Sequence, residues 1–305
     1  MDKITISTFQ LFSMFPDQET ARTYLESRLW PKGATCPSCA KRKRITTRKD
    51  GFYRCNACKL DFTVRTSTIF ERSHVPLHKW LYAMYLLVTS RKGISSLQLS
   101  KEIGITQKSA WFVLQRLREA CGNDFTVLRG IVEVDETYIG GKEKNKHAHA
   151  KTPNKRGPLD KSAVVGMRER GGRTIAKPIE NANAANLRTA IHTHISTGSV
   201  LHTDEHMGYY GLQGVLYTHQ TVNHHKKEWV RGQVHTNSIE SVWAVMKRGL
   251  HGVYHHASVK HLGRYVNEFT FRLNDGKVQR HTLDRLSSFI DATVGRRITY
   301  KALTA

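Results

Sequence analysis

The sequence predicts a mixed α/β fold in which two small N-terminal modules precede a larger domain of strands and helices. Three observations predict it. Two Cys-x₂-Cys pairs mark a compact metal-binding module, a helical pair with a glycine turn follows, and from Gly130 onward short β-rich segments are interspersed with helical ones. The expected order β-β-β-α-β-α is typical of a mixed sheet with flanking helices rather than of an all-β domain.

The composition indicates a globular protein that attracts polyanions. The 305 residues include 48 Lys and Arg against 25 Asp and Glu, a formal net charge of +23. A charge of this size bears on partners rather than on fold, and it favours nucleic acid. No apolar run reaches the ~18 residues of a membrane span, and residues 1–30 lack a signal-peptide pattern. We therefore expect a cytoplasmic protein with no membrane partner.

Residues 1–33 are expected to form an N-terminal helical segment, in which Asp17 caps a helix that ends before Trp30. The next module, residues 34–63, contains two Cys-x₂-Cys pairs separated by 15 residues, formed by Cys36, Cys39, Cys55 and Cys58. This spacing matches a four-thiolate Zn²⁺ site. Disulfides are the alternative, and the lack of an export signal disfavours them. Four thiolates leave no open position for water, so the zinc would be structural.

Residues 74–122 have the pattern of a helix-turn-helix. Residues 96–104 and 106–118 are expected to be helical, with Gly104 as the turn, Thr106 as the cap of the second helix, and Leu97 among the residues that pack the pair together. The exposed first turn of the second helix, where a recognition helix meets base edges, would carry Gln107, Lys108, Ser109 and Trp111. The alternative is a helical hairpin of the core with a solvated polar face.

Three carboxylates stand out in the domain expected over residues 130–275. Asp135 ends the strand-like residues 131–135, Asp204 ends residues 200–204, and Glu240 opens a helix. Two strand-borne aspartates that converge with a helix-borne glutamate supply oxygen ligands for two Mg²⁺ or Mn²⁺ ions about 4 Å apart. That arrangement serves in-line phosphodiester displacement, so we expect this domain to cut or join nucleic acid.

Strand alternation sorts the acids around Asp135. Asp135 shares a face with Glu133, whereas Glu136 falls on the opposite face with Val132 and Val134. The alternation therefore disfavours Glu136 as a metal ligand and leaves Glu133 open. The basic residues 142–161, with no apolar period, are expected to form a loop that either holds a nucleic-acid backbone or is merely solvated.

Glu240 admits two interpretations. In Asn237–Glu240 it could be a helix-start device that reaches back to the Asn237 N–H. Alternatively it is a ligand, because Glu240 and Lys247 lie on one helical stripe, and Lys247 could then reach a phosphate of the bound strand. Trp243 is expected to face the core, and His235 is the histidine most expected to line the site.

The ordered motifs resemble those of a known family. They are the zinc ribbon, the helix-turn-helix, and the segments 134–141, 202–204, 235–240, 247–249 and 254–256. From about Phe15 to Asn274 the chain is similar to bacterial insertion-sequence DDE transposases of the ISXO-like group, which carry a zinc ribbon ahead of an RNase H-like catalytic domain. The resemblance implies that Asp135, Asp204 and Glu240 form the metal-binding triad and that Lys247 accompanies it. Asn237 is held as a further contributor, because parts of this group have asparagine at the third acidic position.

The resemblance also implies a function. A metal-dependent polynucleotidyl transferase of this kind would bind the terminal inverted repeats of an insertion sequence, cleave their 3′ ends and join them to target DNA, working as a homo-oligomer at the nucleoid. Residues 276–305 lie outside the resemblance and are expected to form a helical tail. Two other classes stay open: a DNA-binding regulator without catalysis, and an RNase H-like nuclease that cleaves without strand transfer.

Overall fold

The computed structural model describes residues 5–122, 126–141, 147, 149, 161–214 and 216–304, without the side chain of Asp50. Most of the expected basic loop, residues 142–161, lies outside these described residues. The chain divides into two compact units. One unit comprises Met1–Asn123 and Asp275–Ala305, and the other comprises Asp124–Asn274.

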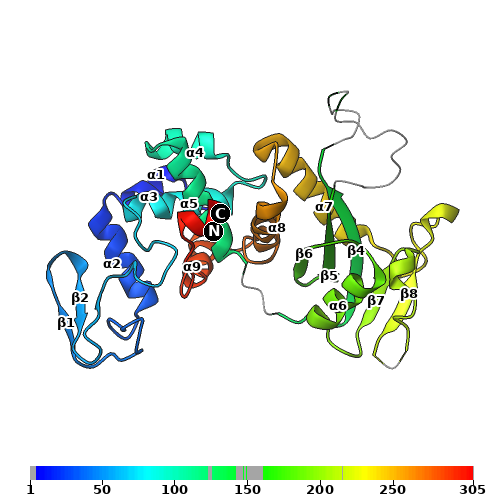
Figure 1. Cartoon of the computed structure of the whole chain (residues 1–305), viewed down its shortest axis with the longest axis horizontal. Coiled ribbons are helices and arrows are strands. Elements are labelled where there is room, and N and C mark those ends of the chain that lie inside the picture. The colour runs from blue at the N-terminus through cyan, green and yellow to red at the C-terminus, as the bar shows by residue number, and fades with distance from the viewer. Residues whose placement is uncertain are drawn as a thin grey trace. The chain divides into compact units, whose positions relative to one another are not determined.

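The first unit is helical apart from one small sheet. Its elements are α1 (Thr8–Met14), α2 (Gln18–Leu29), β1 (Ile45–Thr47), η1 (Lys49–Gly51), β2 (Tyr53–Cys55), β3 (Asp61–Phe62), α3 (Leu77–Thr89), α4 (Ser96–Ile103), α5 (Gln107–Ala120), α9 (Thr282–Asp291) and α10 (Tyr300–Thr304). The three strands form an antiparallel sheet in the order β1-β2-β3 (Figure 1). As expected, Asp17 caps α2, since its carboxylate accepts a hydrogen bond of 2.8 Å from Thr20 N.

Helices α4 and α5 meet at the expected turn. Gly104 adopts the left-handed conformation, with φ 61°, and Thr106 caps α5 by accepting a hydrogen bond from Ser109 N. The expectation for Leu97 is wrong, because its side chain is 56% exposed. Helix α4 buries Leu99 and Ile103. Leu97 is two residues from Leu99, a rotation of roughly 200° that places it on the opposite face.

The C-terminal segment is helical, as expected, and belongs to the first unit. Helix α9 contacts α2 and α3. The buried Arg285 guanidinium donates to the Val88 carbonyl oxygen at 2.8 Å, and Arg28 pairs with Asp291 at 2.6 Å. Residues near the two ends of the sequence therefore pack together in one compact unit.

The second unit is built on a five-stranded mixed sheet. Its strands are β4 (Ile131–Ile139), β5 (Ser162–Glu169), β6 (Thr174–Ile179), β7 (Val200–Thr203) and β8 (Thr218–Thr221). Their order is β6-β5-β4-β7-β8 (Figure 1). Strands β6, β5 and β4 pair antiparallel, while β4, β7 and β8 pair parallel. This is the RNase H-like arrangement, as expected.

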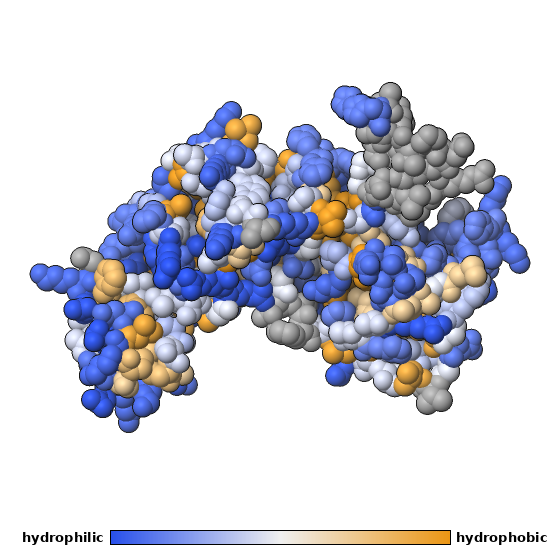
Figure 2. All heavy atoms as spheres, viewed as in Figure 1, coloured by the Kyte–Doolittle hydropathy of each residue, from blue (hydrophilic) through white to orange (hydrophobic). Residues whose placement is uncertain are grey.

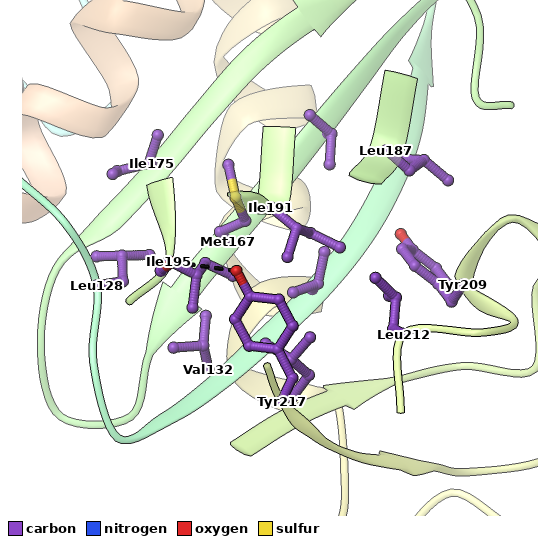
Figure 3. Packing of buried hydrophobic residues seen from close by; sticks show 13 residues of the cluster. Leu128, Val132, Met167, Ile175, Leu187, Ile191, Ile195, Tyr209, Leu212 and Tyr217 are labelled. Atoms are coloured by element: carbon purple, nitrogen blue, oxygen red, sulfur yellow. Dashed lines mark hydrogen bonds between the residues drawn. The ribbon is translucent and has the colours of Figure 1, made fainter. Parts of the chain in front are cut away.

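Helices cover both faces of this sheet. They are α6 (Ala184–His194), α7 (Asn237–Gly249) and α8 (Val259–Asn274), with short helical turns η4 (Met207–Tyr209), η5 (His224–Lys226) and η6 (Leu250–Tyr254). On one face α6 packs over Val132, Val134 and Met167, and the Tyr217 hydroxyl donates to the Ile195 carbonyl oxygen (Figure 3). On the other face α7 and α8 pack over Val164 and Ala176. Strand β4 thus lies between two hydrophobic cores.

On the face shown in Figure 2, hydrophilic side chains cover most of each unit, and hydrophobic side chains occur there in small scattered groups. In the described part of the chain, no helix has both the length and the apolar character that crossing a membrane requires.

Candidate active site and metal centre

The parallel pairing of β4 with β7 brings two of the expected site residues to the same level. Glu133 pairs with His202 in the register of these strands. Continuing that register by two residues places Asp135 beside Asp204, which directly follows β7. The two aspartates therefore come from adjacent strands at the level where β7 ends. Asp135 does not end its own strand as expected, because β4 continues to Ile139.

The Asp135 carboxylate is buried at a place where negative charge accumulates. Burial, together with the charges of Glu136 and Asp204, raises the pKa of Asp135 to about 7. Two hydrogen bonds partly oppose this effect: Trp243 Nε1 donates to Oδ2 at 2.8 Å, and the backbone N–H of Glu136 donates to Oδ1 at 2.9 Å. Such a carboxylate needs a nearby positive charge to ionise easily, which a divalent cation would supply.

Glu136 lies closer to this centre than strand alternation indicated. It does point to the face expected for it, because the Tyr209 hydroxyl donates to Glu136 Oε2 at 2.7 Å and Tyr209 belongs to the core under α6. Burial raises the pKa of Glu136, and the charge of Asp204 contributes to that rise. Asp135, Glu136 and Asp204 thus form an acidic group. The position of Glu136 directly after Asp135 was the only sign in the sequence that it belongs to this group.

Short local bonds hold the Asp204 turn. The Asp204 carboxylate accepts from the backbone N–H of His206 at 3.0 Å, and the Thr203 hydroxyl donates to the Asp204 carbonyl oxygen at 2.7 Å. The next residue, Glu205, accepts from the backbone N–H groups of His224 and His225. The loop beyond β8 is therefore tied to the residue that follows Asp204.

Glu133, which strand alternation left open as a metal ligand, is occupied by hydrogen-bond donors in the structure. Its side chain is 0% exposed and accepts from the backbone N–H groups of Ser238 and Ile239 at 2.8 and 3.1 Å, and from Arg170 at 3.0 Å. A carboxylate at a helix N-terminus compensates the unpaired N–H groups and the helix dipole. Glu133 therefore fastens the start of α7 to β4.

The start of α7 differs in detail from the expected capping pattern. Thr236 is the N-cap and Asn237 is the first helical residue, and Glu240 accepts from the Thr236 hydroxyl at 3.0 Å rather than from the Asn237 N–H. The strand-borne Glu133 takes the place of a local cap. His235 lies with its Nδ1 3.3 Å from Glu133 Oε1, under this helix start.

The remaining expected residues of α7 face solvent. Asn237, Glu240 and Lys247 are exposed. Trp243, one turn after Glu240, is buried as expected, but its N–H reaches Asp135. Within the described residues, the one group of three or more His, Cys, Asp or Glu side chains whose ligand atoms lie within 4.8 Å of one another is the cysteine set. Helix α7 therefore contacts Asp135 through Trp243, without bringing Glu240 to that distance from both aspartates.

The four cysteines do come together. Cys36, Cys39, Cys55 and Cys58 offer four Sγ atoms mutually within 4.8 Å. Backbone N–H groups of Cys58 and Ala57 point at the Cys55 sulfur and lower its pKa to about 6. That stabilises the thiolate, the form that binds Zn²⁺. The donor set and its geometry fit a closed structural zinc site, packed on Phe62 and Trp30.

The expected DNA-contacting residues lie at the start of α5. Gln107, Lys108 and Ser109 are exposed, and Trp111 is partly buried. Gln107 Nε2 donates to Ser96 Oγ at 2.8 Å, and Lys108 Nζ lies 5.0 Å from the centre of the Tyr300 ring of α10. The C-terminal helix therefore borders the surface that these residues form.

Two regions of the chain match known protein families. Residues 16–61 match the transposase zinc-ribbon domain, and residues 127–274 match the ISXO2-like transposase domain. Over 274 residues the chain is 29% identical to an uncharacterized protein in transposable element ISH50 of Halobacterium salinarum, covering 85% of this chain and 91% of that protein.

Two solved structures are similar to this chain, but more weakly than the Halobacterium protein. A chain of the simian T-cell lymphotropic virus intasome in complex with PP2A regulatory subunit B56 gamma is 13% identical, with a TM-score of 0.28 over 65% of this chain and 66% of that one. A chain of a pre-cleavage Mos1 transpososome is 14% identical, with a TM-score of 0.27 over 70% of this chain and 77% of that one.

The two family matches together span well over half of the sequence. The chain is therefore a member of the insertion-sequence transposases that join a transposase zinc ribbon to an ISXO2-like transposase domain.

Proposed function

We propose that this transposase binds the terminal inverted repeats of its insertion sequence and catalyses Mg²⁺-dependent 3′-end cleavage and strand transfer. One observation carries the proposal: Asp135 within β4 lies beside Asp204 at the end of the adjacent parallel strand β7, and the helix that bears Glu240 and Lys247 is fastened to β4. The excess of basic residues in the chain favours a DNA substrate.

In this proposal Asp135, Asp204 and Glu240 would hold two divalent ions. Bound Mg²⁺ would supply Lewis acidity to the attacking and the leaving oxygens of an in-line displacement. The exposure of Glu240 fits a ligand that engages on binding of metal and DNA, because its side chain is held only locally, by the hydroxyl of the N-cap residue Thr236. Lys247, exposed two turns further on, is suited to hold a phosphate of the DNA strand.

The first unit would recognise the DNA ends. Gln107, Lys108, Ser109 and Trp111 are the proposed contacts, and the zinc would keep the ribbon folded rather than take part in chemistry. Pairing of two ends calls for a homo-oligomer acting on DNA at the nucleoid. Asn237 and His235 remain proposed contributors near the start of α7.

A cleavage and joining assay tests the proposal. DNA from the flanks of the reading frame, which carries the element's ends, is incubated with Mg²⁺ and the wild-type protein or the variants D135N, D204N and E240Q. We expect 3′-end cleavage and joining by the wild type and a loss of at least about 100-fold in each variant. Glu180→Gln, an exposed acid of the same unit, is the matched control.

The outcomes separate the three function classes. Cleavage without joining would favour a nuclease, and end binding without cleavage would favour a regulator. Full activity of D135N would show that the site is wrongly assigned.

A further inference from the structure

Trp243 of α7 and Gly166 of β5 meet directly beside Asp135. Gly166 pairs with Asp135 across β4 and β5. A Cβ atom at Gly166 would lie 2.4 Å from both Cζ2 and Cη2 of Trp243, closer than real side chains approach. The absence of a side chain at residue 166 therefore creates the space in which the indole ring lies against the sheet.

The indole ring does more than fill this space. Trp243 is 4% exposed, and its Nε1–H, which can only donate, has Asp135 Oδ2 as acceptor at 2.8 Å. A buried indole N–H requires an acceptor, but a carbonyl oxygen would meet that requirement without the cost of a buried carboxylate. The pairing thus acts on Asp135 as well as on Trp243.

The hydrogen bonds determine how the Asp135 carboxylate is oriented. Oδ2 accepts from Trp243 and Oδ1 from the backbone N–H of Glu136. A carboxylate has about four lone-pair directions, two on each oxygen. One donor on each oxygen prevents the group from rotating and leaves a further lone pair on each, which is the arrangement a carboxylate needs to bind a cation through either oxygen.

We propose that Trp243 is a positioning residue for divalent-cation binding, which orients Asp135 through its N–H, and that Gly166 is required because it admits the indole ring. The inference rests on the proposed function, since it concerns the same site. It adds a residue from α7, one turn after Glu240, to the machinery around β4. Glu133 at the helix start and Trp243 one turn after Glu240 then hold α7 at two points on β4.

Trp243→Phe tests the N–H, because phenylalanine keeps an aromatic ring in the core and lacks the donor. Loss of an outer-shell partner of a metal ligand typically costs 10–100-fold in metal affinity. We expect the Mg²⁺ concentration for half-maximal cleavage to rise about 10-fold. In the absence of DNA, a fixed concentration of Mn²⁺ should raise the melting temperature of the variant by less than it raises that of the wild type. Binding of end DNA without divalent ions should be unchanged.

Met246→Leu is the matched control, because Met246 is buried in the same core on the same helix. It should keep the wild-type requirement for Mg²⁺. Gly166→Ala should act like Trp243→Phe, since its methyl group displaces the indole. Phenylalanine has no atoms equivalent to Cζ2 and Cη2, and the other close contact of the added methyl group, 2.9 Å to Ile239 Cδ1, is with the flexible end of a side chain. Adding Gly166→Ala to Trp243→Phe should therefore raise the Mg²⁺ requirement less than about twofold further.

The results separate this inference from the proposed function. A wild-type Mg²⁺ requirement and Mn²⁺ response in Trp243→Phe, while D135N abolishes cleavage, would overturn the positioning role alone. Equal losses in Trp243→Phe and Met246→Leu would assign Trp243 to packing. Undiminished cleavage by D135N would instead remove the proposed site. If Gly166→Ala had the same effect with tryptophan or phenylalanine at residue 243, the role of Gly166 would be refuted.

Discussion

Replacing Asp135 by asparagine should stabilise the metal-free protein at neutral pH while it abolishes activity. The folded-state pKa of Asp135 is about 7, against an ordinary value of 3.8. Because the pKa is raised by folding, the ionised form destabilises the folded state. The cost is absent below pH ~4, grows as the pH rises toward about 7, and is constant above it.

The magnitude follows from the difference of about three pKa units, each corresponding to 1.36 kcal/mol, or about 4 kcal/mol at pH 8 as an upper figure. Asparagine can accept from Trp243 through Oδ1, but its amide group then faces the Glu136 N–H, an unfavourable contact that costs roughly 1–3 kcal/mol. We therefore expect D135N to raise the free energy of unfolding at pH 8 by about 1–3 kcal/mol, or the melting temperature by at least about 3 °C.

The assay is thermal unfolding followed by circular dichroism, without added divalent ions, at pH 4.5 and pH 8. The stabilisation should be largest at pH 8. It should diminish or reverse at pH 4.5, where residue 135 is neutral in the folded state of both proteins. The matched control E180Q should show no such pH dependence. A D135N variant that is no more stable than wild type at pH 8, or whose advantage is the same at both pH values, would refute a raised pKa of Asp135.

Three further predictions concern other parts of the molecule. Cys36→Ser should release the zinc, measured as metal content per chain, and weaken end binding; an unchanged DNA footprint would contradict a role of the ribbon in recognition. Glu133→Ala should lower the free energy of unfolding by about 3–5 kcal/mol, because Arg170 loses its buried partner and α7 loses its cap. A loss of less than ~1 kcal/mol in a denaturant titration would argue against these roles. Lys108→Ala should weaken end binding and make its affinity less sensitive to salt, without changing the Mg²⁺ requirement; an unaltered affinity in a fluorescence-anisotropy titration would remove Lys108 from the interface.

The features that the sequence predicted well depend on neighbouring residues. The caps Asp17 and Thr106 and the turn at Gly104 are each fixed by bonds within a few residues, and each Cys-x₂-Cys pair is itself a local pattern. Alternation along β4 also assigned the two faces correctly, because successive side chains of a strand point to opposite sides. It placed Glu136 on the face opposite Asp135, where Tyr209 contacts it, but it gave no sign that the charge of Asp204 on the next strand also acts on this carboxylate.

By itself, the sequence determined the zinc-ligand set, the helix-turn-helix boundaries, the mixed α/β class, the strand that carries Asp135 and the strand end that carries Asp204. Only the tertiary structure decided that Glu133 caps α7, that Trp243 donates to Asp135, and that α9 completes the first unit. The partners in these contacts are 105, 108 and 197 residues apart in the chain. Periodicity reports which face a side chain occupies, whereas hydrogen bonds between distant segments depend on strand register and helix packing, which no local pattern encodes.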